Sequence, residues 1–307
     1  MDLPDGYSTR APRSGDLAAV AGLLAAGGSA TLDAGFVLHQ WSHPAFDLAR
    51  NAVAVVDRDG SVVAYAQVSA EEPTTIESWG VVHPAHRGRG IGSALVEELD
   101  RRARALSPTT APGRFRHAID AGDLAAASIL ETHGLRPVRH FWHMEIDPTA
   151  VETSTSTLDG IVLREIEAPA ELATVHAILD EAFAEDWGYH PQPLDRWSED
   201  HAEGPGYDPT LWALAAEGDE PVGALTASLV DERGWVDEVG VRPAWRGRGV
   251  AAALLLRSFA MFAGRGIRRV ILNVDAENPT GATRLYERVG MRIAARWELW
   301  ERSTDER

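Results

Sequence analysis

Between Val250 and Phe262, in the C-terminal half, apolar residues recur with the period of an α-helix. These apolar residues are Val250, Leu254, Leu255, Phe259 and Phe262. A spacing of three to four residues predicts an amphipathic helix that packs on a core. Apolar runs precede and follow it, at Trp235 to Val241 and at Arg269 to Asp275, and their length and β-branched content indicate strands. The pattern predicts a mixed α/β fold with a central sheet flanked by helices.

The same pattern occurs twice along the chain. The stretch VRPAWRGRG, which begins at Val241, repeats VHPAHRGRG, which begins at Val82. Further on, RVGMR at Arg288 to Arg292 repeats THGLR at Thr132 to Arg136. The distance between the copies is one whole domain and is too long for a solenoid repeat. The sequence therefore predicts a duplicated domain.

Each copy shows the same order of elements around its Arg-Gly-Arg-Gly turn. A short strand, a helical region, a hairpin and a fourth strand come before the turn, and a helix follows it. The corresponding pairs are Tyr7 to Arg10 and Ile161 to Glu165 (first strand), Val53 to Val68 and Leu211 to Leu229 (hairpin), and Ile76 to Val82 and Trp235 to Val241 (fourth strand). The Ser/Thr-rich run between the copies has no apolar period and is typical of a linker. We expect domains at 1–148 and 161–307, joined by a linker at 149–160.

Composition excludes several classes of function. The chain has 307 residues and a formal net charge of -17, which disfavours binding to nucleic-acid phosphates. It has no cysteine, so disulfides, thiolate metal sites and a cysteine nucleophile are excluded. We expect no metal site. No apolar stretch approaches the length of a membrane span and no signal sequence is evident, so we expect a cytoplasmic protein.

The repeated turn has the composition of an anion-binding loop. Its glycines let the backbone approach a ligand, and successive N–H groups at the start of a helix can point into one concavity. The lysine of a Walker loop is missing. A single copy could be an ordinary glycine-rich connection, but two copies in matching strand-to-helix contexts favour a ligand site. The candidate residues are Val82, Arg87, Gly88, Arg89, Gly90, Ile91 and Gly92 in the first copy, and Val239, Gly240, Val241, Arg246, Gly247, Arg248, Gly249, Val250 and Ala251 in the second.

These stretches resemble a signature of the GNAT superfamily of N-acetyltransferases. VHPAHRGRGIG and VRPAWRGRGVA are similar to its R-x-x-G-x-G/A loop, and AENPTGATRLYERVGM is similar to its later A-x-x-L-Y-x-x-x-G-F motif, with Met291 in place of Phe. The resemblance covers both halves. It implies two tandem GNAT-like domains, in which the loop amides hold the pyrophosphate of acetyl-CoA and the pantetheine runs between splayed fourth and fifth strands. Asn278, ahead of the second motif, belongs to the same predicted site.

Tyr286 is the residue that the resemblance assigns to catalysis. A phenol beside the thioester sulfur can hydrogen-bond to the leaving thiolate or protonate it. Tyr286 also fits a core position, on one helix face with Ala282, Leu285 and Val289. Asn278 is expected to cap this helix and Gly290 to end it. The first copy has Leu130 at the tyrosine position, so we expect the N-terminal domain to be non-catalytic.

The acceptor of such a reaction is a primary amine. An alkyl ammonium with a pKa of about 10 must lose a proton before it attacks. Strand alternation places Asp237 on one face with Trp235 and Glu238 on the other, barring a bulge. Asp237 is the expected base or amine-orienting group, acting directly or through water, although a solvated strand-edge acid would look the same. The acidic, aromatic segment Glu181 to Asp208 fits a cover over a small cationic amine, and His190 and His201 in it are further proton acceptors.

The domain layout leaves alternatives for the acceptor. Within the superfamily it is similar to mycothiol synthase, which acetylates an aminosugar-linked cysteine. Trp235 stands where that enzyme has a glutamate base, and Asn273 where it has a substrate-facing tyrosine. We therefore expect acetyl transfer to a small amine of unspecified identity, with the mycothiol-type reaction or a non-catalytic acetyl-CoA-binding protein as alternatives. The sequence leaves the oligomeric state and the length of the acyl chain open.

Overall fold

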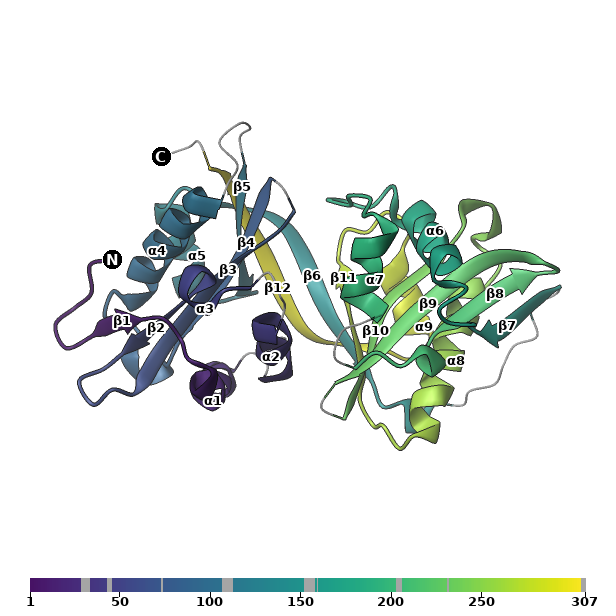
Figure 1. Ribbon diagram of the computed structural model, residues 1–307, viewed down its shortest axis with the longest axis horizontal. Coiled ribbons are helices and arrows are strands. Elements are labelled where there is room, and N and C mark those ends of the chain that lie inside the picture. Colours follow the sequence, from purple (N-terminus) through teal and green to yellow (C-terminus); the bar gives the residue numbers. More distant parts are fainter. Residues whose placement is uncertain are drawn as a thin grey trace. The chain divides into compact units, whose positions relative to one another are not determined.

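The chain forms two compact units (Figure 1). Unit 1 consists of Met1–Phe141 and Ala295–Arg307, and unit 2 of Trp142–Ala294. The structure is a computed structural model. It describes residues 1–28, 34–42, 46–72, 74–106, 113–151, 158, 160–202, 206–230 and 232–304.

Unit 1 is a mixed sheet with helices. Its strand order is β1-β2-β3-β4-β5-β12. Its strands are β1 (Ser8–Arg10), β2 (Ala52–Val56), β3 (Val62–Glu72), β4 (Thr75–Val82) and β5 (Arg114–Asp120). Its helices are α1 (Leu17–Gly27), α2 (Ala34–Ser42), α3 (Leu48–Asn51), α4 (Ile91–Leu106) and α5 (Leu124–Thr132). The expected hairpin is present as β2 and β3, and β4 runs parallel to β5.

Unit 2 repeats this plan. Its strand order is β6-β11-β10-β9-β8-β7. Its strands are β7 (Ile161–Glu165), β8 (Ala213–Glu217), β9 (Glu220–Val230), β10 (Arg233–Val241) and β11 (Val270–Asp275). Its helices are α6 (Leu172–Phe183), α7 (Leu194–Ala202), α8 (Val250–Gly264) and α9 (Ala282–Arg288). The expected mixed α/β fold, with a central sheet flanked by helices, is confirmed.

The last strand of each repeat lies in the sheet of the other unit. Strand β12 (Arg292–Ser303), from the second repeat, pairs antiparallel with β5 from Trp297↔Asp120 to Ser303↔Arg114. Strand β6 (Arg136–Ile146), from the first repeat, lies next to β11. The compact units therefore differ from the sequence repeats by an exchange of terminal strands. A repeat comparison shows where the duplication lies, but it does not show which strand completes which sheet.

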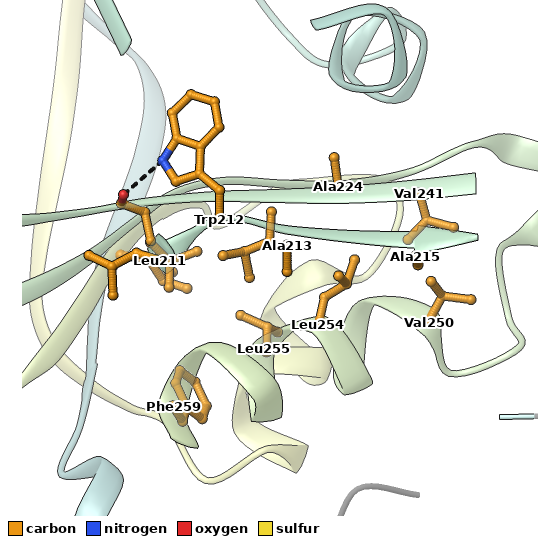
Figure 2. Close-up of a cluster of buried hydrophobic side chains, with 14 of the residues drawn as sticks. Leu211, Trp212, Ala213, Ala215, Ala224, Val241, Val250, Leu254, Leu255 and Phe259 are labelled. Carbon is orange, nitrogen blue, oxygen red and sulfur yellow. Dashed lines mark hydrogen bonds between the residues drawn. The ribbon is translucent and has the colours of Figure 1, made fainter. Parts of the chain in front are cut away.

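Helix α8 packs through the predicted apolar face. Leu254, Leu255 and Phe259 are fully enclosed, and Figure 2 shows them pointing from the helix toward strand residues such as Ala213 and Ala215. On the other face of the sheet, a Cβ at Gly240 would meet the Ala182 Cβ of α6 at 2.8 Å. Unit 2 therefore has one helix layer on each face of its sheet.

The parallel pair at the centre of unit 2 is short. Strands β10 and β11 pair at Gly234↔Val270 and Trp235↔Ile271, whereas β10 continues to Val241. Its other neighbour, β9, accompanies β10 to Val241. Beyond Trp235, the edge of β10 that faces β11 therefore makes no ladder bonds to β11. This unpaired part of the strand leads to the Arg-Gly-Arg-Gly loop.

Candidate active site

The two Arg-Gly-Arg-Gly loops have the same backbone conformation. Gly247 and Gly249 have φ angles of 76° and 85°, and Gly88 and Gly90 have 72° and 85°. These values lie in the left-handed region, which glycine adopts without the steric cost of a Cβ. At Gly247 and Gly88 a Cβ would meet nothing within 4 Å, so backbone conformation rather than crowding selects glycine there.

The loop amides of unit 2 are available to a ligand. The backbone bonds around the loop include Arg246 N to Pro243 O and Ala253 N to Gly249 O. Among the residues that the structure describes, the N–H groups of Gly247, Gly249, Val250 and Ala251 have no protein acceptor. Helix α8 begins at Val250, and its N-cap residue Gly249 has no side chain to cap it. Consecutive unpaired N–H groups at a helix start form a site for an anion.

The arginine side chains shape the loops. Arg246 donates to the Val241 carbonyl (3.3 Å) and to the Ala182 carbonyl at the end of α6 (2.9 Å). Arg87 makes the equivalent bond to the Val82 carbonyl (3.2 Å). Arg248 pairs with Glu217 at 2.6 Å. Since both Arg246 and Arg248 are engaged by the protein, the loop offers an anion mainly its backbone amides.

Tyr286 lies on α9 as a buried residue. The residue is 8% exposed, and no hydrogen-bond partner of the hydroxyl occurs within the described part of the chain. Burial, and then the negative charge of Asp186, raises the pKa of Tyr286. The phenol therefore stays protonated across the physiological range and can donate.

Asn278 stands ahead of α9 but does not cap it. The helix begins at Ala282, with Gly281 at the N-cap, because Asn278 instead accepts from Thr280 N (2.9 Å) and closes a turn. Its amide donates to Asp186 at 3.2 Å. The prediction that Asn278 caps this helix is therefore wrong. At the other end, Gly290 (φ 95°) follows the helix as predicted.

A β-bulge places Asp237 in an unexpected way. The register of β10 on β9 shifts between Val236 and Glu238, so Asp237 is the extra residue. Its carboxylate accepts from the Ser228 hydroxyl at 3.0 Å. The residue is exposed, so solvent screens its charge, but crowding by the surrounding protein raises the pKa of Asp237 to about 6. The bulge therefore interrupts, at Asp237, the regular alternation that was predicted to send the Asp237 and Glu238 side chains to opposite faces.

Glu238 faces α7 and contacts two of its side chains. Trp197 Nε1 donates to Glu238 Oε2 at 3.2 Å, and His201 Nε2 lies 3.4 Å from the same oxygen. Burial raises the pKa of Glu238, whereas His201, Trp197 and His176 lower it. The sequence predicts His201 as a proton acceptor, but its contact with Glu238 cannot be predicted from the sequence because the two residues are far apart in the chain.

Two aromatic residues of the predicted cover, Trp197 and Tyr207, pack in or against the core. Trp197 is 4% exposed and packs edge-on against Trp212, with ring centroids 5.7 Å apart. Tyr207 packs on the same Trp212 at 5.4 Å. Tyr189 donates to Asp180. Packing thus accounts for Trp197 and Tyr207, and the polar groups that remain near β10 are carboxylates and imidazoles.

Strand β6 brings a histidine from the first repeat into unit 2. His143 is 1% exposed, and its Nδ1 lies 3.0 Å from Asn273 Oδ1 on β11. Its ring stands edge-on to Trp235, with centroids 5.8 Å apart. Trp235 and Asn273 are the two positions at which the sequence departs from the mycothiol synthase pattern, and they lie beside the end of the β10–β11 pairing.

Unit 1 has the loop but lacks the other features. Leu130 is buried at the tyrosine position. Strand β4 stays in register with β3 from Glu77 to Val82, without a bulge. Trp79, three residues before the strand-ending Val82 as Glu238 is before Val241, packs on Tyr65 with centroids 5.3 Å apart. The position of the carboxylate is thus filled by an aromatic cluster.

Neither a metal centre nor a membrane-spanning helix occurs in the part of the chain that the structure describes. No group of three His, Asp or Glu side chains there could hold a metal ion. No helix there is both long and apolar enough to cross a membrane.

Comparison with known proteins identifies the fold family. The profile described as Acetyltransferase (GNAT) family matches residues 172–291, and an Acetyltransferase (GNAT) domain matches residues 49–130. Mycothiol acetyltransferase of Streptomyces scabiei is 31% identical over 240 residues, which cover 75% of this chain and 72% of that protein. The mycothiol acetyltransferase of Beutenbergia cavernae is 34% identical over 267 residues, covering 81% and 82% of the two chains.

Solved structures agree over the whole chain. A GCN5-related N-acetyltransferase from Sphaerobacter thermophilus is 35% identical, with a TM-score of 0.87, and the match covers 99% of this chain and 97% of that one. A tandem GNAT protein from the clavulanic acid biosynthesis pathway shares the fold at 14% identity and a TM-score of 0.71, covering 98% and 99%. The chain belongs to the acetyltransferase (GNAT) family and is an N-acetyltransferase with two GNAT domains in tandem.

Proposed function

We propose that the C-terminal half transfers an acetyl group from acetyl-CoA to a small, cationic primary amine by direct attack. The observation that carries this proposal is that three features come together in unit 2: an open amide loop, an unpartnered tyrosine hydroxyl and a bulged carboxylate. Unit 1 has only the loop. Members of the family use acetyl-CoA as co-substrate, which supplies the activated acetyl group and a thiolate leaving group.

The loop fits the pyrophosphate of this co-substrate. Gly247, Gly249, Val250 and Ala251 present N–H groups without protein acceptors among the described residues. Each hydrogen bond from such a donor to a charged oxygen contributes about 1.5–3 kcal/mol. The start of α8 adds about 0.3–1 kcal/mol through its dipole. Several amides acting together therefore outweigh the dipole.

Asp237 and Tyr286 have the complementary roles of base and acid. Asp237, when ionised, takes a proton from the acceptor ammonium and leaves a free amine. The amine nitrogen then bonds to the acetyl carbon. As the carbon–sulfur bond breaks, the Tyr286 hydroxyl gives its proton to the departing sulfur, and the proton that the nitrogen loses on becoming an amide restores the hydroxyl. A covalent acyl-cysteine is excluded because the chain has no cysteine.

The N-terminal half, 1–148, is proposed to be non-catalytic, with a linker at 149–160 and the catalytic half at 161–307. Leu130 has no proton to donate, and the aromatic pair Trp79 and Tyr65 fills the space that Glu238 has in unit 2. The N–H groups of Gly88, Gly90, Ile91 and Gly92 have no backbone acceptor among the described residues. The proposal therefore includes binding of a phosphate group by this half.

A second candidate acceptor is the aminosugar–cysteine conjugate of the mycothiol-type reaction. It is favoured by curated relatives named mycothiol acetyltransferase at 31% and 34% identity. Release of thiol from acetyl-CoA separates the candidates when small amines, polyamines, aminoglycosides and the conjugate are supplied in turn. A kcat/KM for the conjugate well above that of every other amine would select the second candidate.

Release of thiol from acetyl-CoA, measured together with calorimetric titration of acetyl-CoA binding, tests the assignment of the working half. Gly249→Glu places a carboxylate in the loop of unit 2, and Gly90→Glu is its matched control at the same φ angle in unit 1. We expect Gly249→Glu to abolish thiol release and Gly90→Glu to leave it in place. The opposite pattern, or activity that survives Gly249→Glu, would contradict the proposal.

A further inference from the structure

The bulge at Asp237 brings two carboxylates to one face of the sheet. After the bulge, Glu238 lies opposite Thr226 of β9. The Asp237 carboxylate accepts from the hydroxyl of Ser228, two residues further along the same strand, at 3.0 Å. Side chains two residues apart share one face of a strand, so both carboxylates lie on the face of Thr226 and Ser228. Without the bulge, alternation would place them on opposite faces.

Helices α6 and α7 cover this face. Gly240 is the next residue of β10 on the same face as Glu238, and a Cβ there would meet the Ala182 Cβ of α6 at 2.8 Å. Trp197 of α7 donates to Glu238 Oε2 at 3.2 Å. Helix α7 belongs to the acidic, aromatic segment that was predicted to cover a cationic amine. The two carboxylates therefore lie on the side of the sheet where the acceptor is proposed to bind.

The two carboxylates are separated along the strands. An antiparallel strand advances about 3.4 Å per residue, so the positions of Ser228 and Thr226, opposite the two carboxylates, are about 7 Å apart. An ionised carboxylate binds one ammonium group through charge-assisted hydrogen bonds. Two carboxylates at this separation fit two ammonium groups that are joined by a short methylene chain.

Glu238 can accept one more partner. Trp197 Nε1 and His201 Nε2 both lie against its Oε2 atom, at 3.2 and 3.4 Å. Its Oε1 atom accepts no hydrogen bond from the residues that the structure describes, and no arginine among them pairs with Glu238. The side chain is 21% exposed. A ligand can therefore reach the carboxylate and bind its free oxygen.

A second polar group beside Glu238 has no partner. The hydroxyl of Thr226, opposite Glu238 in register, is fully buried and makes no hydrogen bond within the described part of the chain. Buried polar groups without partners cost free energy, as does a partly enclosed carboxylate without an arginine partner. Unit 1 has Trp79 in place of this carboxylate. The wall around Glu238 is therefore arranged for a charged ligand rather than for packing alone.

We propose that the acceptor is a diamine: Asp237 takes a proton from the ammonium that reacts, and Glu238 binds the second ammonium, about 7 Å away. This inference rests on the proposed function, in which Asp237 is the base. Glu238 is then the residue that determines the class of acceptor, because a monoamine leaves its free oxygen without a partner.

The ratio of kcat/KM for putrescine to kcat/KM for pentylamine tests this role. The two amines have the same length, and pentylamine has a methyl group where putrescine has its second ammonium. We expect the unaltered protein to favour putrescine about tenfold or more, the effect of one hydrogen bond to a charged group. Glu238→Gln is expected to remove this preference and to leave kcat/KM for pentylamine in place.

The variant and its control keep the fold. Glutamine has the size of glutamate and can still accept from Trp197 Nε1, so Glu238→Gln keeps the contact between β10 and α7. Asp219→Asn, in the exposed turn between β8 and β9, removes one negative charge from the same unit and is the matched control. We expect it to retain the preference for putrescine.

Calorimetric titration with putrescine in the presence of CoA measures binding of the diamine without turnover, because CoA has no acetyl group to transfer. We expect Glu238→Gln to weaken putrescine binding about tenfold or more and to leave pentylamine binding unchanged. Circular dichroism and acetyl-CoA titration of each variant show whether the fold and the loop are intact.

The outcomes separate this inference from the proposed function. Equal kcat/KM for the two amines in the unaltered protein, or a preference for putrescine that survives Glu238→Gln, overturns the role of Glu238. No thiol release with any amine, while putrescine binding still depends on Glu238, overturns the proposed function instead. A preference that is lost in Glu238→Gln and kept in Asp219→Asn, in kinetics and in calorimetry, supports both.

Discussion

The hydroxyl of Tyr286 has no hydrogen-bond partner within the described part of the chain, so a phenylalanine there would keep the packing of this buried residue. We therefore expect Tyr286→Phe to lower kcat by about 10²–10⁴-fold, the range of general acid catalysis. Thermal unfolding should occur at the same temperature or higher, because no hydrogen bond is lost. Unchanged turnover would assign Tyr286 to the core alone.

The raised pKa of Asp237 makes a prediction about stability. The folded-state pKa of about 6 lies above the ordinary value of about 3.9, so the folded state holds the proton more tightly than the unfolded state. Its stabilising contribution is complete below pH 4 and is lost as pH rises through 6. Asp237→Asn should therefore raise the unfolding temperature at pH 8 and not at pH 4.

Solvent contact at Asp237 limits the size of this gain but not its sign. Thermal unfolding of both proteins at the two pH values measures it, and the same variant should lose activity at pH 8. A variant that is less stable at pH 8 would show that the carboxylate stabilises the fold instead. Gain of stability with loss of activity is the pattern of a group kept for chemistry.

At the scale of single elements, the contact between α6 and β10 depends on Gly240. A Cβ there would lie 2.8 Å from the Ala182 Cβ and 3.0 Å from Leu179 Cδ2. Overpacking of this kind costs about 1–3 kcal/mol, so Gly240→Ala should lower the free energy of unfolding by that amount. Gly264→Ala, where a Cβ meets nothing within 4 Å, is the matched control. Equal stability of the two variants in denaturant titrations would contradict this packing.

The elements that the sequence predicted well are those specified locally. The apolar period of α8 and the glycines of the loops depend on dihedral angles and on residues three or four apart, and both can be read from a single stretch. The start of α9 was misplaced because Asn278 closes a turn with Thr280, which competes with capping. The bulge at Asp237 follows from the pairing of β10 with β9, and no turn residue in the stretch WVDEVGV signals it.

At the scale of the whole molecule, the two repeats complete each other's sheets, which no periodicity can show. Met144 and Ile146 of β6 belong to the hydrophobic core of unit 2, and His143 bonds to Asn273 on β11. All three residues come from the first repeat. This exchange gives the half that we propose to be non-catalytic a structural role, because it supplies the strand next to β11 in the proposed catalytic half.

The exchange predicts the behaviour of separated halves. A fragment of residues 149–307 lacks β6, so β11 becomes an unpaired edge and the core loses Met144 and Ile146. Because an exposed edge strand promotes aggregation, we expect this fragment to be insoluble or unfolded by circular dichroism. Fragment 136–307 restores β6 and is the matched control, expected to fold in unit 2 and to bind acetyl-CoA in calorimetry. A folded, active 149–307 would show that the catalytic half does not need the strand of its neighbour.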